Sequence, residues 1–174
     1  RRKNLLLRDL DELVNQQLAK MLFANPHRMD YYDRYQEIID AYNAEQNRAT
    51  IEKTFMDLME LASSLDTEQQ RYVREGFSSD EELSVYDLLF SENLTKQEIE
   101  TIKKVSVDLL TKIKQQIAKL DHWTDKQETK AIVDNLIRNT LWQELPNSYD
   151  VSDIQTYQKK ICLLYTSPSP RDTR

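Results

Sequence analysis

Apolar residues recur at spacings of three and four along most of this 174-residue chain, which is the spacing of an amphipathic α-helix. No segment alternates apolar and polar residues as a half-buried strand does. The sequence therefore predicts an all-α fold, a single bundle or array of about eight amphipathic helices. The helices are predicted at residues 4–23, 29–45, 51–65, 67–75, 80–90, 96–120, 125–145 and from 150 onward.

Polar residues that can cap helix N-termini precede several of these runs. Ser79 with Glu82 and Thr95 with Glu98 have the spacing of a capping box, in which each side chain accepts a hydrogen bond from the other residue's backbone. Gly76, the single glycine, follows the predicted fourth helix and is expected to adopt the left-handed conformation of a C-cap. Further N-caps are predicted at Thr50, at Asp66 with Gln69, at Thr124 with Gln127, and at Asp150.

The second predicted helix carries tyrosines on its apolar face. Tyr32, Tyr35 and Tyr42 recur in register with Ile38 and Ile39. We interpret them as a core stripe whose hydroxyl groups reach the rim of the core. The alternative is a platform on which nucleic-acid bases stack.

Composition excludes several classes of function. A Walker A phosphate loop needs two glycines within eight residues and a dinucleotide-binding turn needs three within six, so one glycine can build neither. A hydrophobic fraction of 39% and a mean hydropathy of −0.74 suit helices with wide solvated faces. No apolar run approaches the ~20 residues of a membrane span. A single cysteine, Cys162, rules out an intrachain disulfide and favours a reducing cytoplasm.

Charge is distributed unevenly along the chain. Lys and Arg number 24 against 30 Asp and Glu, and a net charge of −6 argues against a dedicated nucleic-acid-binding domain. Residues 52–92 are strongly acidic, whereas residues 96–119 carry six lysines against three acids. These lysines are candidate contacts to a phosphate backbone, with a solvated helix face as the alternative. They are Lys96, Lys103, Lys104, Lys112, Lys114 and Lys119.

Groups that could carry catalysis are sparse. The two histidines, His27 and His122, do not form a metal-binding motif with the single cysteine, so no catalytic, cofactor-binding or metal-ligating residue is predicted. Glu128 and Lys130 match half of a metal-dependent nuclease motif, but they fall inside a predicted helix rather than on a strand. Large aromatic residues often anchor interfaces, so the candidate partner contacts are Trp123 and Trp142.

The two ends of the chain differ from the rest. The chain opens at Arg1 without a start methionine or a signal peptide, so we expect a fragment of a longer protein. Residues 161–174 (ICLLYTSPSPRDTR) end in a Ser/Pro-rich run that looks like translated sequencing-adapter or other cloning-derived sequence. We expect residues 161–174, including Cys162, to be a disordered tail outside the fold.

An ordered set of short segments, spread over about residues 25–160 and so over most of the chain, resembles the C-terminal helical region of type I restriction endonuclease R subunits, the HsdR family. No single segment is specific, and the order and spacing of the set carry the resemblance. The segments are residues 25–32 (NPHRMDYY), 35–39 (YQEII), 55–61 (FMDLMEL), 71–77 (RYVREGF), 81–89 (EELSVYDLL), 94–98 (LTKQE), 123–127 (WTDKQ) and 145–150 (LPNSYD).

The resemblance implies a place within a larger assembly. Residues 1–24 would be a helix linking from a preceding domain, and residues 25–160 would be the C-terminal helical domain. The parent would be a cytoplasmic bacterial or archaeal enzyme that translocates and cuts DNA with ATP and Mg²⁺. Its partners would be the methyltransferase and specificity subunits, and DNA through the whole complex. No catalytic residue of that family falls on this chain, and a stand-alone helical module that binds nucleic acid or protein is the alternative.

Overall fold

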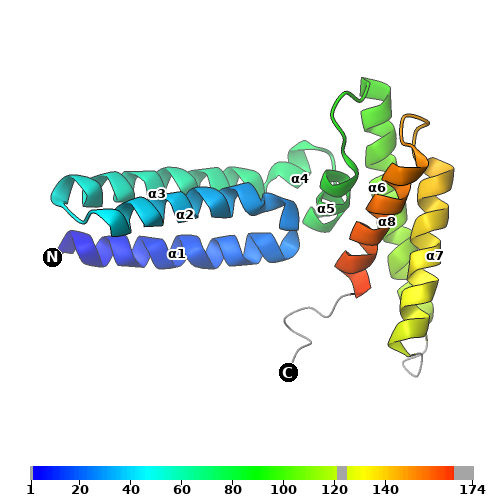
Figure 1. Cartoon of the computed structure of the whole chain (residues 1–174), viewed down its shortest axis with the longest axis horizontal. Helices are drawn as coiled ribbons and strands as arrows, with labels where there is room; N and C mark the ends of the chain where they lie inside the picture. Colours follow the sequence, from blue (N-terminus) through cyan, green and yellow to red (C-terminus); the bar gives the residue numbers. More distant parts are fainter. Residues whose placement is uncertain (1, 121–124, 167–174) are drawn as a thin grey trace. The chain divides into compact units, whose positions relative to one another are not determined.

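The computed structural model describes residues 2–120 and 125–166, and these residues form helices and their connections without a strand (Figure 1). The all-α class predicted from the sequence is thereby confirmed. The helices are α1 (Arg2–Ala24), the 3₁₀-helix η1 (Pro26–Arg28), α2 (Met29–Ala44), α3 (Arg48–Gln69), α4 (Arg71–Arg74), α5 (Asp80–Leu89), α6 (Lys96–Lys119), α7 (Lys126–Glu144) and α8 (Val151–Thr166).

The helices divide into two compact units, whereas the sequence predicted a single bundle. Unit 1 is residues 1–84 and unit 2 is residues 85–174, and the boundary falls inside α5. Three long helices in each unit pack on one another, so each unit has its own apolar core. Periodicity shows that a helix has a buried face, but it does not show which other helix covers that face.

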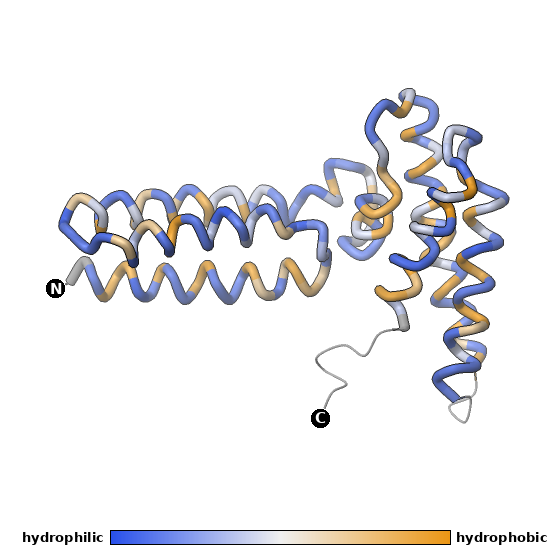
Figure 2. The backbone as a smooth tube through the Cα atoms, in the orientation of Figure 1, coloured by the Kyte–Doolittle hydropathy of each residue, from blue (hydrophilic) through white to orange (hydrophobic). Residues whose placement is uncertain are grey.

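Unit 1 is built from α1, α2 and α3, and α3 packs against both of the others (Figure 1). Figure 2 shows apolar positions recurring along each of these helices, as the periodicity predicts. Because α1 contributes four core residues, this helix belongs to the unit, and the interpretation of residues 1–24 as a link from a preceding domain stays a prediction. The buried core consists of Leu7, Val14, Leu18, Met21, Tyr35, Ile38, Leu58, Leu61 and Leu65.

The tyrosines of α2 are part of this core. Tyr35 is buried, and its hydroxyl group donates a hydrogen bond of 2.6 Å to Asp11 Oδ1 on α1. Burial, followed by this hydrogen bond, raises the pKa of Tyr35 well above its ordinary value. Tyr32 and Tyr42 are half-buried against the same core. The interpretation as a core stripe is confirmed, and these rings are not arranged as an open platform for bases.

Unit 2 is built from α6, α7 and α8, with α7 packed against both of the others (Figure 1). The buried hydroxyl group of Tyr149 donates a hydrogen bond to the carbonyl of Leu89, which ties the loop before α8 to the end of α5. The long helices bury side chains at the spacing expected from the sequence. These are Ile102, Val105, Leu109, Leu110 and Ile113 on α6, Val133, Ile137 and Leu141 on α7, and Ile154 and Ile161 on α8.

The chain remains part of the fold beyond residue 160. Helix α8 continues to Thr166, and both Ile161 and Cys162 are buried. Excluding residues 161–174 from the fold was therefore wrong for residues 161–166. Ile154 and Ile161 are two helical turns apart and so face the same side of α8, which extends the apolar stripe of the helix. The proposed disordered tail at residues 167–174 lies outside the described residues.

The predicted capping box of Thr95 with Glu98 is confirmed. Thr95 Oγ1 accepts a hydrogen bond of 3.1 Å from the backbone of Glu98, and Glu98 Oε1 accepts one of 3.1 Å from the backbone of Thr95. Ser79 Oγ accepts a hydrogen bond from the backbone of Glu82 at 3.2 Å, so Ser79 is a cap as predicted. The Glu82 side chain accepts from the backbone of Ser78 instead of Ser79, so the second bond of this predicted box does not form as expected. Gly76 has a φ of +86°, so the left-handed C-cap is also confirmed.

Three other predicted caps are wrong. Asn47, three residues before Thr50, caps α3 through its side-chain oxygen. Helix α3 runs through Asp66 to Gln69, which leaves α4 as one short turn, because Leu65 and Glu68 are buried on the face of α3 and favour its continuation. The N-cap of α7 is Asp125, not Thr124, and it accepts a hydrogen bond of 2.7 Å from the backbone of Glu128.

We expect the substitution Thr95→Ala to destabilise unit 2 by about 1 kcal/mol, because the backbone amide of Glu98 loses its acceptor. Urea unfolding followed by tryptophan fluorescence measures the loss, since both tryptophans belong to unit 2. Thr101→Ala is the matched control, because Thr101 is half-buried inside α6 and its hydroxyl group donates to the carbonyl of Gln97 in the same helix. An equal loss in both variants would contradict the role of Thr95 as a cap.

Candidate functional site

The pair Glu128 and Lys130 does not form a metal site in the described part of the chain. Both side chains are exposed on the first turns of α7, and residues two apart on a helix do not face each other. Within residues 2–120 and 125–166, no group of three or more His, Cys, Asp or Glu side chains is placed to hold a metal ion. The structure thus brings no second ligand to Glu128 from this part of the chain.

The six candidate lysines of α6 lie on more than one side of the helix. Lys96, Lys103 and Lys114 are separated by 7 and 11 residues, which places them on one side, whereas Lys112 and Lys119 share another. The Lys103 ammonium lies 5.9 Å from the centre of the Tyr86 ring. The exposed lysines are Lys96, Lys104, Lys114 and Lys119. Their contact with phosphate stays a prediction.

Lys112 bridges two helices of unit 2. Its ammonium group lies 3.0 Å from Asp108 Oδ2 on α6 and 3.0 Å from Glu144 Oε2 on α7. The two carboxyl groups shift in opposite directions. Burial and the neighbouring Asp108 raise the pKa of Glu144, while hydrogen bonds from Glu144 and Lys112 lower the pKa of Asp108. The positive charge of Lys112 is balanced inside the unit, so it is the lysine of the set with the clearest structural role.

Trp142 is the tryptophan that the structure places. It lies on α7 five residues after the buried Ile137, so it points to the opposite side of the helix, and half of its surface is exposed. An exposed tryptophan of this kind suits a partner contact, which stays a prediction. Trp123 lies outside the described residues.

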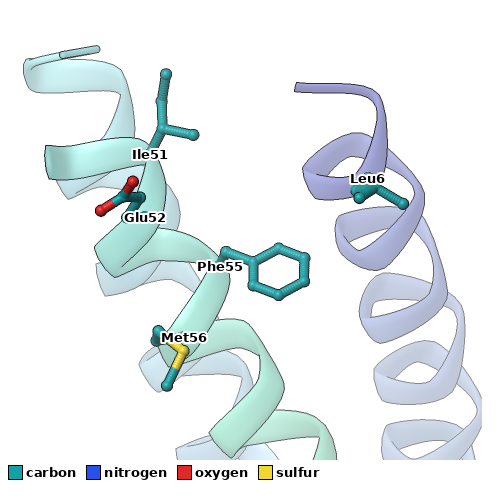
Figure 3. Close-up of a pocket in the computed structure, with 5 residues that line it drawn as sticks. All are labelled: Leu6, Ile51, Glu52, Phe55 and Met56. Carbon is teal, nitrogen blue, oxygen red and sulfur yellow. The ribbon is translucent and has the colours of Figure 1, made fainter. Parts of the chain in front are cut away.

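A second exposed apolar feature lies between α1 and α3 of unit 1. A pocket of about 390 Å³ is lined by Leu6 of α1 and by Ile51, Glu52, Phe55 and Met56 of α3. In Figure 3 the Phe55 ring extends from α3 toward Leu6. Four of the five lining side chains are apolar. We call this feature the α1–α3 groove.

Unit 1 also contains a buried network of charged side chains. Arg28, which is buried in η1, donates from Nε to Glu68 Oε2 at 2.8 Å, and its two terminal nitrogens reach Asp80 at 2.8 and 2.5 Å. Arg71 donates to Glu68 at 2.7 Å. We call these four residues the Arg28 network. It joins the turn between α1 and α2 to the end of α3 and to the first residue of α5.

The Arg28 network shifts the pKa of Glu68 and of Arg28. Burial favours the neutral form of each group, but here the pairing outweighs it. The pKa of Glu68 is lowered by hydrogen bonds from Arg71 and Arg28 despite its burial. Hydrogen bonds to Asp80 and Glu68 raise the pKa of Arg28 despite its burial. Glu68 and Arg28 therefore keep their charges at neutral pH, and the network connects elements of unit 1 rather than forming a site for proton transfer.

The chain was compared with models of protein families. Residues 1–162 match the model described as the C-terminal region of the type I restriction enzyme HindI endonuclease subunit-like family.

The chain belongs to this family. The resemblance to type I restriction R subunits is confirmed, and the part of the subunit is its C-terminal helical region. The match begins at residue 1 and includes Ile161 and Cys162, in agreement with the packing of α1 and α8. Neither the curated proteins nor the solved structures gave a match to this chain. No helix in the described part of this restriction-subunit domain has the length and apolarity to span a membrane.

Sequence reasoning missed the two features of unit 1 that stand out in this restriction-subunit domain. Arg28 and Arg71 lie inside segments that carry the family resemblance, yet nothing local shows that Arg28 meets Glu68, 40 residues away. The groove had a weak signal, because Leu6 and Leu13 repeat at seven residues on the side of α1 next to the core stripe. An apolar stripe too wide for one neighbouring helix is the pattern that could have revealed it.

Proposed function

We propose that this domain is non-catalytic and docks the DNA-translocating and DNA-cutting part of a type I restriction R subunit onto the methyltransferase and specificity subunits. The observation that carries the proposal is the family match over residues 1–162. The exposed apolar side chains of the α1–α3 groove and of Trp142 support it, since such groups are suited to protein contacts.

We further propose that ATP and Mg²⁺ act elsewhere in the longer R subunit. The residues present do not fit either group: the chain has one glycine, which serves as a helix C-cap, and the described residues gather no metal-ligand cluster. In this proposal DNA reaches the domain only through the assembled complex. A cytoplasmic location in a bacterium or archaeon follows from the proposed role in restriction.

Binding to the methyltransferase–specificity core of the same restriction system tests the docking role. We expect the purified 174-residue chain to co-elute with that core in size-exclusion chromatography and to show no ATP hydrolysis alone. The methyltransferase subunits of an unrelated restriction type are the control for non-specific association. Failure to co-elute at micromolar concentration would contradict the proposal.

A further inference from the structure

The α1–α3 groove lies on a side of unit 1 where large apolar side chains are exposed. On one side of α1, Asp11 accepts a hydrogen bond from Tyr35, so α2 lies there. Leu6 and Leu13 lie toward the opposite side of α1, and 52% and 64% of their side chains are exposed. Met56 and Met59 on α3 are 66% and 49% exposed. Exposure of four large apolar side chains on one unit is typical of an interaction surface.

The shape of the groove suits a helix. Helices α1 and α3 run in the same direction, with α2 between them in the sequence (Figure 1). The Phe55 ring extends toward Leu6 at one end (Figure 3), and Gln17 donates a hydrogen bond of 3.1 Å to Asp66 further along. The apolar part thus ends at a polar pair, after about 16 Å at 1.5 Å per residue. That length corresponds to about three helical turns. A helix laid there would complete a four-helix bundle.

The lining residues argue against a small-molecule site. Such sites combine an apolar wall with several converging polar groups that fix the orientation of the ligand. The groove offers Glu52 as its one ionisable lining residue, and Glu52 already lies 3.5 Å from Arg48 on its own helix. An apolar helix face needs no further polar anchor.

The negative charge of unit 1 favours a basic helix over an acidic one as the partner. Unit 1 contains 17 Asp and Glu against 11 Lys and Arg, so it carries the whole net charge of −6, while unit 2 is formally neutral. Besides Glu52 in the lining, Asp9 lies between Leu6 and Leu13 on the same side of α1 and is exposed. A second copy of unit 1 would bring like charges together, whereas a helix with Lys or Arg beside its apolar stripe would be attracted.

We propose that the α1–α3 groove binds an amphipathic helix of a partner protein, with an apolar stripe of about three turns and basic residues on its flanks. The inference rests on the proposed docking function and names the surface and the partner chemistry. Leu6, Leu13, Met56 and Met59 contact the stripe, and Asp9 on α1 faces a basic flank.

Two designed peptides test the recognition directly on the full chain. The first probe is an 18-residue helix with leucines at helical spacing and lysines on both flanks, and the second has the same leucines with glutamates in place of the lysines. We expect saturable binding of the lysine peptide by fluorescence anisotropy and binding at least tenfold weaker for the glutamate peptide. A scrambled lysine peptide without a stripe controls for charge alone. Equal binding of the scrambled and ordered lysine peptides would overturn the proposal.

Substitutions in the groove link the surface to docking. We expect Leu13→Lys and Met56→Lys each to weaken binding of the lysine peptide and of the methyltransferase–specificity core by about tenfold or more. Both side chains are exposed, so the helical circular dichroism should be unchanged. Val73→Lys is the matched control, because Val73 is an equally exposed apolar residue of unit 1 on α4.

The results of these experiments distinguish failure of the groove proposal from failure of the docking proposal. If the core binds the wild-type chain and both groove variants equally, the groove proposal is overturned and the docking function stands. If the core does not bind the wild-type chain, the docking function fails, and the peptide experiment decides the groove on its own. Loss of both peptide and core binding in the groove variants, but not in Val73→Lys, supports both.

Discussion

Replacing Arg28 by methionine is expected to destabilise unit 1 by about 3–5 kcal/mol. Methionine keeps much of the side-chain volume but removes every hydrogen bond to Glu68 and Asp80. Glu68 keeps Arg71 as a partner, while Asp80 loses both hydrogen bonds from Arg28. Removing one partner of a buried ion pair leaves an uncompensated charge, which costs far more than the loss of an exposed pair.

Arg34→Met is the matched control for this change. Arg34 lies on α2 of the same unit, but it is exposed and pairs with Glu37 at 3.7 Å, so its loss is expected to cost less than 0.5 kcal/mol. Hydrogen exchange in peptides from α2 and α3 measures the free energy of opening of unit 1 separately from unit 2. If Arg28→Met lowered the free energy of opening of unit 1 by less than about 1 kcal/mol, the Arg28 network would not be a major source of its stability.

Acid also tests the Arg28 network. The pKa of Glu68 is lowered in the folded chain, so its contribution to stability is present above the unfolded carboxyl value of about 4.3 and is lost as the pH falls toward the folded value. Protonation of Glu68 removes the acceptor for Arg28 and Arg71. The wild-type chain should therefore lose more stability in unit 1 between pH 5 and pH 3 than the Arg28→Met variant does.

Local chemistry explains why the helices could be predicted well. The apolar stripes of α1, α2 and α6 and the capping box of Thr95 with Glu98 depend on residues within one or two turns, which the sequence shows directly. The errors at Thr50 and Thr124 have the same origin. Asn47 and Asp125 are equally good caps within three residues, and only the start of the buried face decides between them.

Long-range contacts explain what could not be predicted. The Arg28 network brings together residues 40 and 52 positions apart, and a polar residue in a turn carries no periodic sign of such a partner. The boundary between the two units, at Ser84 and Val85, depends on which helices pack together. Helices with the same apolar spacing can form one core or two, so the spacing does not predict this boundary. The groove forms where α1 and α3 lie side by side, so its position depends on how the helices of unit 1 pack and not on the sequence of either helix alone.

The end of α8 shows how a composition argument misplaced a boundary. The Ser/Pro-rich run begins after Tyr165, but the preceding residues of the same segment continue the helix. Ile161 has an exposed fraction of 0% in unit 2, whereas its neighbour Leu163 is 62% exposed. The two residues share one helix and a similar size but differ in burial, which makes them a matched pair for testing whether this end belongs to the fold.

We expect Ile161→Ala to destabilise unit 2 by about 2–5 kcal/mol, because it removes buried methyl and methylene groups and leaves a cavity beside α7. Leu163→Ala should change stability by less than 0.5 kcal/mol, since its side chain is exposed. Urea unfolding followed by tryptophan fluorescence, with hydrogen exchange of α7 peptides, measures both. Ending the chain after Lys160 should destabilise unit 2 at least as much as Ile161→Ala, whereas ending it after Thr166 should not. Equal stability of the chains ending at Lys160 and Thr166 would mean that the last turns of α8 contribute nothing to the core.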